Sequence, residues 1–146
     1  MIVAGLKIPP DLISLIDQGR WPRNGEQATA QNLKPLIPVA LARNFEPDSP
    51  GLHLYPPPFT PIRWQVEDGY AFWLDPMAAP FEIDHNLAID IADFGIGFDA
   101  PIILDYKNHR TEPVVKYLKW SRVNKLDNHW TKMFDSFSAF AAAMGL

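Results

Sequence analysis

The second half of the chain carries the clearest alternation of apolar and polar positions. Between 87 and 92, large apolar residues alternate with small or acidic ones: Leu87, Ile89 and Ile91 against Ala88, Asp90 and Ala92. This period of two predicts a half-buried β-strand. Apolar runs at 101–106 and 114–120 predict two further strands. Because only short turns at 94–97 and 107–110 separate these segments, we expect antiparallel hairpins.

The first third of the chain predicts one strong and one weaker helix. Apolar residues recur at helical spacing in the first of them: Leu12, Ile13, Leu15 and Ile16. Pro9 and Pro10 favour the start of this helix, and Gly19 favours its end. Asn24 can cap a second helix that runs to about Lys34.

A final helix is expected after residue 135. Asp135 or Ser136 can cap it, and Gly145 suits the position beyond its end. Because the strand and helix periods match in this half, we predict one shared core: Leu87, Ile89, Ile91, Ile102, Leu104, Phe137, Phe140 and Met144. The tight turn after the first strand predicts a positive φ at Gly95 or Gly97.

The stretch from 35 to 80 is expected to be irregular. It holds ten of the fifteen prolines, so any strand in it must be short, as at 52–55. It also holds seven aromatic residues, which a flexible linker would lack. We therefore predict an α+β fold with residues 1–146 as one domain. Its antiparallel sheet is flanked by N-terminal and C-terminal helices, and a proline-rich wrap of loops packs on the core.

Composition narrows the class of protein. The chain has no cysteine, which excludes disulfides, thiol nucleophiles and cysteine-based zinc sites. It shows no secretory signal and no apolar run near the roughly 18 residues of a membrane span, so we expect a cytoplasmic protein. The net charge of −4 disfavours direct nucleic-acid binding. We expect no cofactor.

Charge is distributed unevenly along the chain. From Glu67 to Asp105 there are nine acidic residues and no lysine or arginine, whereas the segment from Lys107 to Lys132 is mainly basic. One interpretation is a mixed, solvated surface. The other is an acidic patch that steers a basic protein partner. The candidate partner-binding residues of that patch are Glu82, Asp84, Asp93 and Asp99.

No set of residues in the sequence assembles a catalytic or metal site. Asp93-Phe94-Gly95 matches the metal-binding triplet of kinases, but the other kinase motifs are absent. No two of the four histidines are four residues apart, as a helical metal site requires. Asp84-His85 comes nearest to an acid–base pair, although aspartate is also favoured in turns. We predict neither enzyme activity nor a metal.

Several motifs together resemble the SUKH superfamily, the group of the yeast cell-wall-assembly regulator. They are Leu54-Tyr55-Pro56-Pro57-Pro58-Phe59, Ile83-Asp84, the segment 88–106, Trp120, His129-Trp130 and the last helix. The opening Pro9-Pro10-Asp11-Leu12 and Trp21-Pro22 fit as well. Two positions depart from the pattern: Ala92 stands where glycine is expected, and Phe98 where serine is expected.

The resemblance implies an α+β fold and a role in binding proteins. Many bacterial members of the superfamily are immunity proteins that neutralise a cognate toxin, often a nuclease encoded beside them, and yeast members act as interaction hubs. The alternatives are a regulatory scaffold without a toxin partner, and a small-molecule binder or enzyme with a site near Asp84-His85. Exposed carboxylates on a flat face would favour the immunity protein, and a deep pocket with convergent polar groups would favour the small-molecule site.

Overall fold

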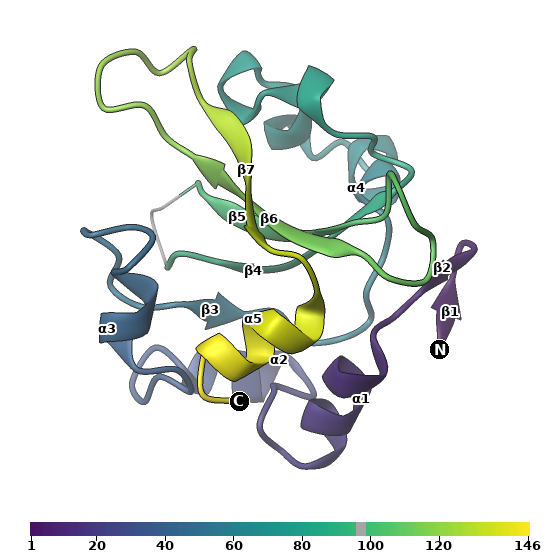
Figure 1. Ribbon diagram of the computed structural model, residues 1–146, viewed down its shortest axis with the longest axis vertical. Helices are drawn as coiled ribbons and strands as arrows, with labels where there is room; N and C mark the ends of the chain where they lie inside the picture. The colour runs from purple at the N-terminus through teal and green to yellow at the C-terminus, as the bar shows by residue number, and fades with distance from the viewer. Residues whose placement is uncertain (96–98) are drawn as a thin grey trace.

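The centre of the fold is a five-stranded antiparallel sheet. In this computed structural model, which describes residues 1–95 and 99–146, the strands lie side by side in sequence order, β3-β4-β5-β6-β7 (Figure 1). They span His53–Leu54, Ala88–Asp93, Pro101–Asp105, Val114–Lys119 and His129–Phe134. The antiparallel meander predicted from the short turns is confirmed, and the chain is α+β.

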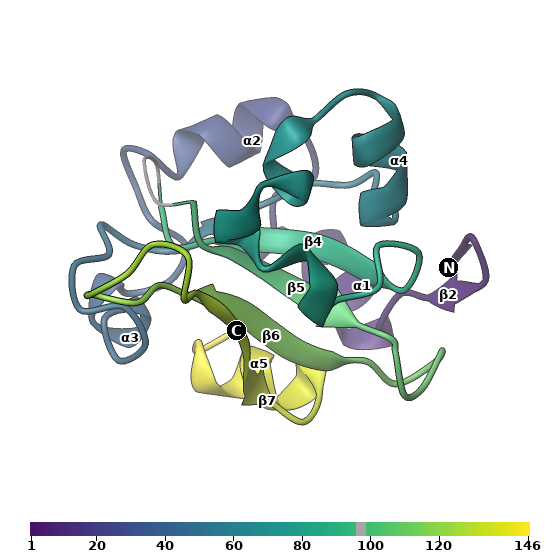
Figure 2. The ribbon, with the colours of Figure 1, turned by 90° about the horizontal axis from the view of Figure 1, so that it is seen from above.

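Helices cover both faces of this sheet. The α-helices are α1 (Pro10–Asp17), α2 (Gly25–Ala30), α3 (Val39–Ala42), α4 (Ile62–Glu67) and α5 (Phe137–Ala143). Three 3-10 turns follow α4: η1 (Ala71–Leu74), η2 (Pro76–Ala78) and η3 (Pro80–Glu82). Figure 2 shows α5 on one face of the sheet, with α4 and the 3-10 turns on the other. No helix in the described part of the chain is both long and apolar enough to cross a membrane.

The larger core lies on the face covered by α1 and α5. Seven of the eight residues predicted to share a core are buried in it, and Leu87 packs against it half-buried. A smaller core lies on the opposite face: Ile62, Trp73, Ala78, Ile83, Ala88, Ile103, Leu118 and Trp130. The expected shared core is thus confirmed, and the sheet separates it from a second one.

Strand β4 is covered on both faces over part of its length, so the expectation that one face is left to solvent was wrong in part. Ala88 and Ala92, which were expected to face solvent, are both fully buried. Ala88 belongs to the smaller core because α4 and the 3-10 turns cover that face. Ala92 joins the larger core because the register of β4 on β5 shifts between Asp90 and Ala92, which is a β-bulge.

The predicted helix ends are largely correct. Asn24 caps α2, since its Oδ1 accepts a hydrogen bond from the Gln27 amide at 2.9 Å, but α2 ends at Ala30, before the expected Lys34. Of the two candidate caps of α5, the structure uses Ser136. Gly145 follows α5 with a φ of 73°. The stretch from 35 to 80 forms the expected wrap of loops and short helices.

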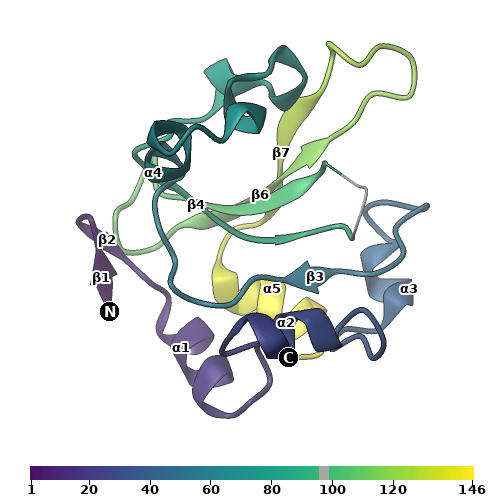
Figure 3. The ribbon, with the colours of Figure 1, turned by 180° about the vertical axis from the view of Figure 1, so that it is seen from behind.

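Two sheet elements were not expected from the sequence. Strand β7, at one edge of the sheet, has no strict alternation to mark it. The N-terminal residues form a separate ribbon of β1 (Ile2–Val3) and β2 (Leu6–Lys7). At the other edge, α2 lies beside β3 (Figure 3), and the buried Gln31 amide both donates to and accepts from the backbone of Leu54 at 2.9 Å. This pairing covers the edge of β3.

Gly95 has the positive φ that was predicted for this turn, at +106°; Gly97 lies outside the described residues. A Cβ atom on Gly95 would lie 2.5 Å from Cγ of Pro50 and 2.9 Å from the carbonyl oxygen of Gly51. The turn after β4 therefore packs directly on the Pro50–Gly51 backbone, and only glycine fits at this position.

We predict that Gly95→Ala lowers the free energy of unfolding by about 3 kcal/mol or more, because backbone strain and a steric clash add. Gly69→Ala is the matched control: Gly69 has a φ of +90°, but nothing lies within 4 Å of the added Cβ. We expect it to lose only about 1 kcal/mol, from strain alone. Urea unfolding of both variants measures the difference, and equal losses would contradict the close packing described here.

Candidate functional site

The bulge in β4 brings two aspartates to the same face of the strand. Because Ile91 and Ala92 both turn into the larger core, Asp93 returns to the face that carries Asp90. Both carboxylates line a hollow of about 370 Å³ on the side of the sheet covered by α4 and η1. The other residues that line it are Tyr55, Gln65, Tyr70, Phe72, Trp73, Gly95, Asp99 and Pro101. We call it the acidic hollow.

A chain of two hydrogen bonds holds Asp90. The buried Trp73 indole donates to Oε1 of Gln65 at 2.8 Å, and Nε2 of Gln65 donates to Oδ1 of Asp90 at 2.6 Å. Since both ends of the Gln65 amide are used, its orientation and that of the Asp90 carboxylate are fixed. The indole comes from η1, the amide from α4 and the carboxylate from β4, so three elements must fold together to form this part of the site.

Asp93 is held by a second set of donors. Tyr55 donates its hydroxyl to Oδ2 of Asp93 at 2.6 Å, and the Gly95 amide donates to Oδ1 at 2.7 Å. Burial, together with the negative charge of Asp93, raises the pKa of the Tyr55 phenol well above its usual range. Tyr55 therefore stays protonated and acts as a hydrogen-bond donor, so it is unsuited to serve as a base.

Burial also shifts the acidity of the two aspartates. It raises the pKa of Asp90 to about 6, although the hydrogen bond from Gln65 acts in the opposite direction. It raises the pKa of Asp93 as well, despite the donors on both of its oxygens. At neutral pH the hollow therefore holds negative charge that the fold accommodates at a loss of stability, and a bound cation would offset that loss.

Of the four predicted patch residues, the structure brings only Asp93 and Asp99 into the hollow. Asp99 is exposed, and its backbone carbonyl accepts a hydrogen bond from the Trp120 indole at 2.7 Å. Asp84 is exposed but does not line the hollow. Its Oδ1 accepts a hydrogen bond from the Asn86 amide at 2.9 Å, which makes it a turn residue.

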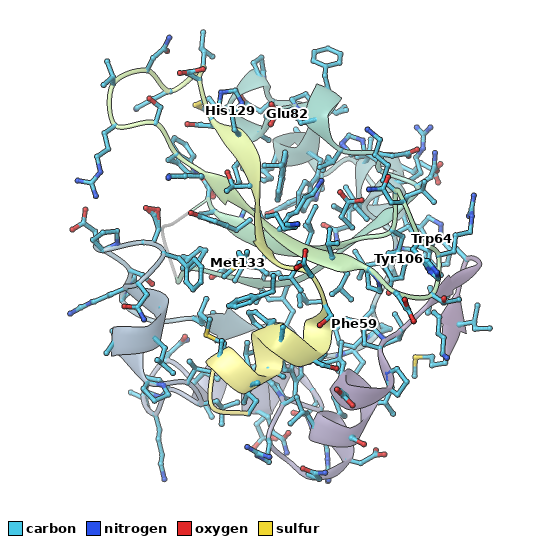
Figure 4. All side chains as sticks on the ribbon, in the orientation of Figure 1. Phe59, Trp64, Glu82, Tyr106, His129 and Met133 are labelled. Atoms are coloured by element: carbon cyan, nitrogen blue, oxygen red, sulfur yellow. The ribbon has the colours of Figure 1, made fainter. Side chains whose placement is uncertain are left out.

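Glu82, the fourth predicted residue, lies at a different place and joins η3 to β7. Its two carboxylate oxygens contact Nδ1 of His129 at 2.7 Å and the amide of Trp130 at 2.8 Å. Figure 4 shows Glu82 and His129 side by side where β7 begins. Hydrogen bonds to Glu82 and to Asp127 raise the pKa of His129 above its usual value. Glu82 therefore has a structural role at this junction.

The Asp84-His85 pair does not form an acid–base unit in the described residues. The Asp84 carboxylate is turned to the Asn86 amide, and no hydrogen bond joins it to the His85 ring. The backbone carbonyl of His85 accepts from the Arg63 amide at 2.8 Å. Burial and the charge of Arg63 lower the pKa of His85. The pair thus helps to connect the start of β4 to α4.

Sequence reasoning missed most of the hollow. Asp90 was expected on the solvent face of a half-buried strand. Tyr55 was noted only in the short strand expected at 52–55, in a resemblance motif and among the aromatic residues of the wrap, Tyr70 only among those aromatic residues, and Gln65 was not singled out. The i, i+3 spacing of Asp90 and Asp93 places them on opposite faces of a regular strand. Only the bulge makes the two aspartates neighbours, and no pattern in the sequence predicts the bulge.

Neither the arrangement of metal-binding side chains nor a similar protein assigns a role to the hollow. No group of three or more histidine, aspartate or glutamate side chains is arranged to hold a metal ion within residues 1–95 and 99–146. Comparisons with protein-family models, with curated proteins and with solved structures found no match for this chain. Its role must therefore be inferred from its geometry and from the sequence motifs.

We predict that Asp90→Asn stabilises the protein at neutral pH. Between pH 4 and pH 6, folded Asp90 keeps a proton that the unfolded chain has lost, so the free energy of unfolding falls as pH rises through this window. Asparagine keeps the oxygen that accepts from Gln65 but cannot ionise. At pH 7.5 the variant should be more stable by about 2 kcal/mol, with the difference vanishing near pH 4. Urea unfolding across this pH range tests it, and a pH-independent difference would contradict it.

Proposed function

We propose that this chain is a non-catalytic protein-binding module of the immunity-protein type, which acts in the cytoplasm and neutralises a bacterial toxin by covering a basic surface. The observation that carries the proposal is the acidic hollow, in which half-buried carboxylates stand beside aromatic rings. Tyrosine and tryptophan are enriched at the energetic centres of protein interfaces. The negative net charge of the chain would speed association with a basic partner.

The state of the hollow favours binding over chemistry. Asp93 is engaged on both oxygens, Tyr55 stays protonated, and the Gln65 amide is fixed at both ends. Asp90, whose pKa is raised to about 6, could move a proton. A catalytic centre also needs a nucleophile beside it, or a second acid–base group that is both free and oriented, and no such group lines the hollow among the described residues.

A small-molecule site is the second candidate function. Its supporting observation is the size of the hollow, which falls at the lower end of the roughly 300–1,000 Å³ typical of ligand pockets. The small-molecule site would be the hollow and not Asp84-His85, because these two residues do not line the hollow.

Co-expression with the product of the neighbouring gene tests the immunity proposal. If that product inhibits growth, this chain should restore growth and form a complex with it in equal proportion. A neighbouring product that is not toxic, or a toxin that this chain fails to bind, would overturn the proposal.

We further predict that Asp99→Lys slows association with that toxin about tenfold at low salt, because it reverses charge at the hollow. Glu112→Lys is the matched control: Glu112 is also exposed but lies in the β5–β6 turn, at the opposite end of the sheet. It should change the rate less than about twofold. Glu82 and Asp93 are unsuitable for charge reversal, since both hold backbone amides in place. Stopped-flow measurements that gave equal rates for both variants would contradict a role of the hollow in docking.

A further inference from the structure

We propose that the acidic hollow binds the guanidinium group of an arginine side chain presented by the protein partner. The inference rests on the proposed function, because it names the chemistry of the partner at the same site. Three features of the hollow support it: uncompensated negative charge, aromatic walls and a fixed array of acceptors.

The negative charge of the hollow has no counterpart in the chain itself. Asp90, Asp93 and Asp99 line it, but no lysine or arginine does so among the described residues. None of the three makes a salt bridge in the described part of the chain, whereas the buried Asp105 elsewhere in the sheet has Lys116 at 2.6 Å. The buried Asp105 carboxylate thus has a cationic partner within the described chain. The carboxylates of the hollow have none there, so a cation from a bound protein can pair with them.

The walls of the hollow suit a flat cation. Tyr55, Tyr70, Phe72 and Trp73 contribute aromatic rings, and Tyr70 is 58% exposed, so an incoming group can reach it. A cation within about 6 Å of a ring face is attracted by the ring's quadrupole. Guanidinium is planar and weakly hydrated, and it stacks on such rings better than the compact, strongly hydrated ammonium of lysine does.

The acceptors in the hollow match the donors of guanidinium. Each carboxylate oxygen can accept about two hydrogen bonds. Asp90 receives one side-chain bond, on Oδ1 from Gln65, and each oxygen of Asp93 receives one bond from within the fold. Both carboxylates therefore keep accepting capacity, and arginine carries five donors in a rigid fork that fits carboxylates in pairs. The volume of about 370 Å³ accommodates one long side chain.

Titration with N-acetyl-arginine amide, followed by NMR, tests the inference without the toxin. The amide should shift the signals of the Trp73 indole and the Gly95 backbone amide, with saturation in the millimolar range, on the order of 4 kcal/mol for one side chain. N-acetyl-citrulline amide, which is nearly isosteric but uncharged, should produce no saturable shift. N-acetyl-lysine amide should bind more weakly than the arginine probe.

Paired variants assign the binding to the hollow. Asp90→Asn keeps the acceptor for Gln65 and removes the charge, so it should weaken binding of the arginine probe at least about fivefold. Glu112→Gln removes an equal charge at the opposite end of the sheet and should leave binding unchanged. Circular dichroism and urea unfolding of both variants ensure that the comparison is made on folded protein.

Four results would overturn the inference: no saturable shift up to about 50 mM of the arginine probe, equal binding of citrulline, equal binding of lysine, or no effect of Asp90→Asn. If agmatine, a free guanidino compound, bound more than about tenfold tighter than the arginine probe, the hollow would be a metabolite site instead. Failure of these titrations while the toxin is still neutralised would refute the arginine pocket alone. Arginine binding without neutralisation would refute the immunity role alone.

Discussion

The β-bulge between Asp90 and Ala92 is the constraint on which both the core and the candidate site depend. It turns Ile91 and Ala92 together into the larger core, and in doing so it returns Asp93 to the face of Asp90. A regular strand would place the two carboxylates on opposite faces, with one of them directed into the apolar core. The same irregularity thus completes the packing under α5 and creates the acidic hollow beneath η1.

The sequence predicts the fold to the extent that local patterns determine it. Apolar alternation and short turns give β4, β5 and β6, and the caps Asn24 and Ser136 mark two helix starts. Strand β7 is not predicted, because its pairing with β6 is itself bulged and its edge position imposes no strict alternation of apolar and polar residues. The smaller core is not predicted either. It forms where α4 and η1 cover one face of β4, and these elements come from a proline-rich stretch without a regular hydrophobic period.

The candidate site is less predictable because its residues meet only through tertiary structure. The acidic run from Glu67 to Asp105 suggests one continuous patch, but its residues have different roles in the structure. Glu82 joins η3 to β7, and Asp84 forms a turn. Asp93 both holds the turn at Gly95 and lines the hollow. Tyr55 and Gln65 come from the wrap and are recognisable only once their hydrogen bonds to β4 are seen. The sequence therefore shows where acidic residues are concentrated. Only the structure shows which of these carboxylates hold the fold together and which can bind another group.

If the proposed arginine binds in the hollow, it is not sufficient by itself to hold the proposed toxin. One close charge pair contributes at most about 7 kcal/mol, whereas a nanomolar complex requires about 12 kcal/mol. The remainder must come from apolar surface around the anchor. The η1–η3 segment, which supplies Phe72 and Trp73 to the hollow, also exposes Leu74 at 58% and leaves Phe81 fully exposed. Because Glu82 fixes the end of this segment to His129 and Trp130, these side chains are held in position before a partner arrives, which reduces the conformational entropy lost on binding.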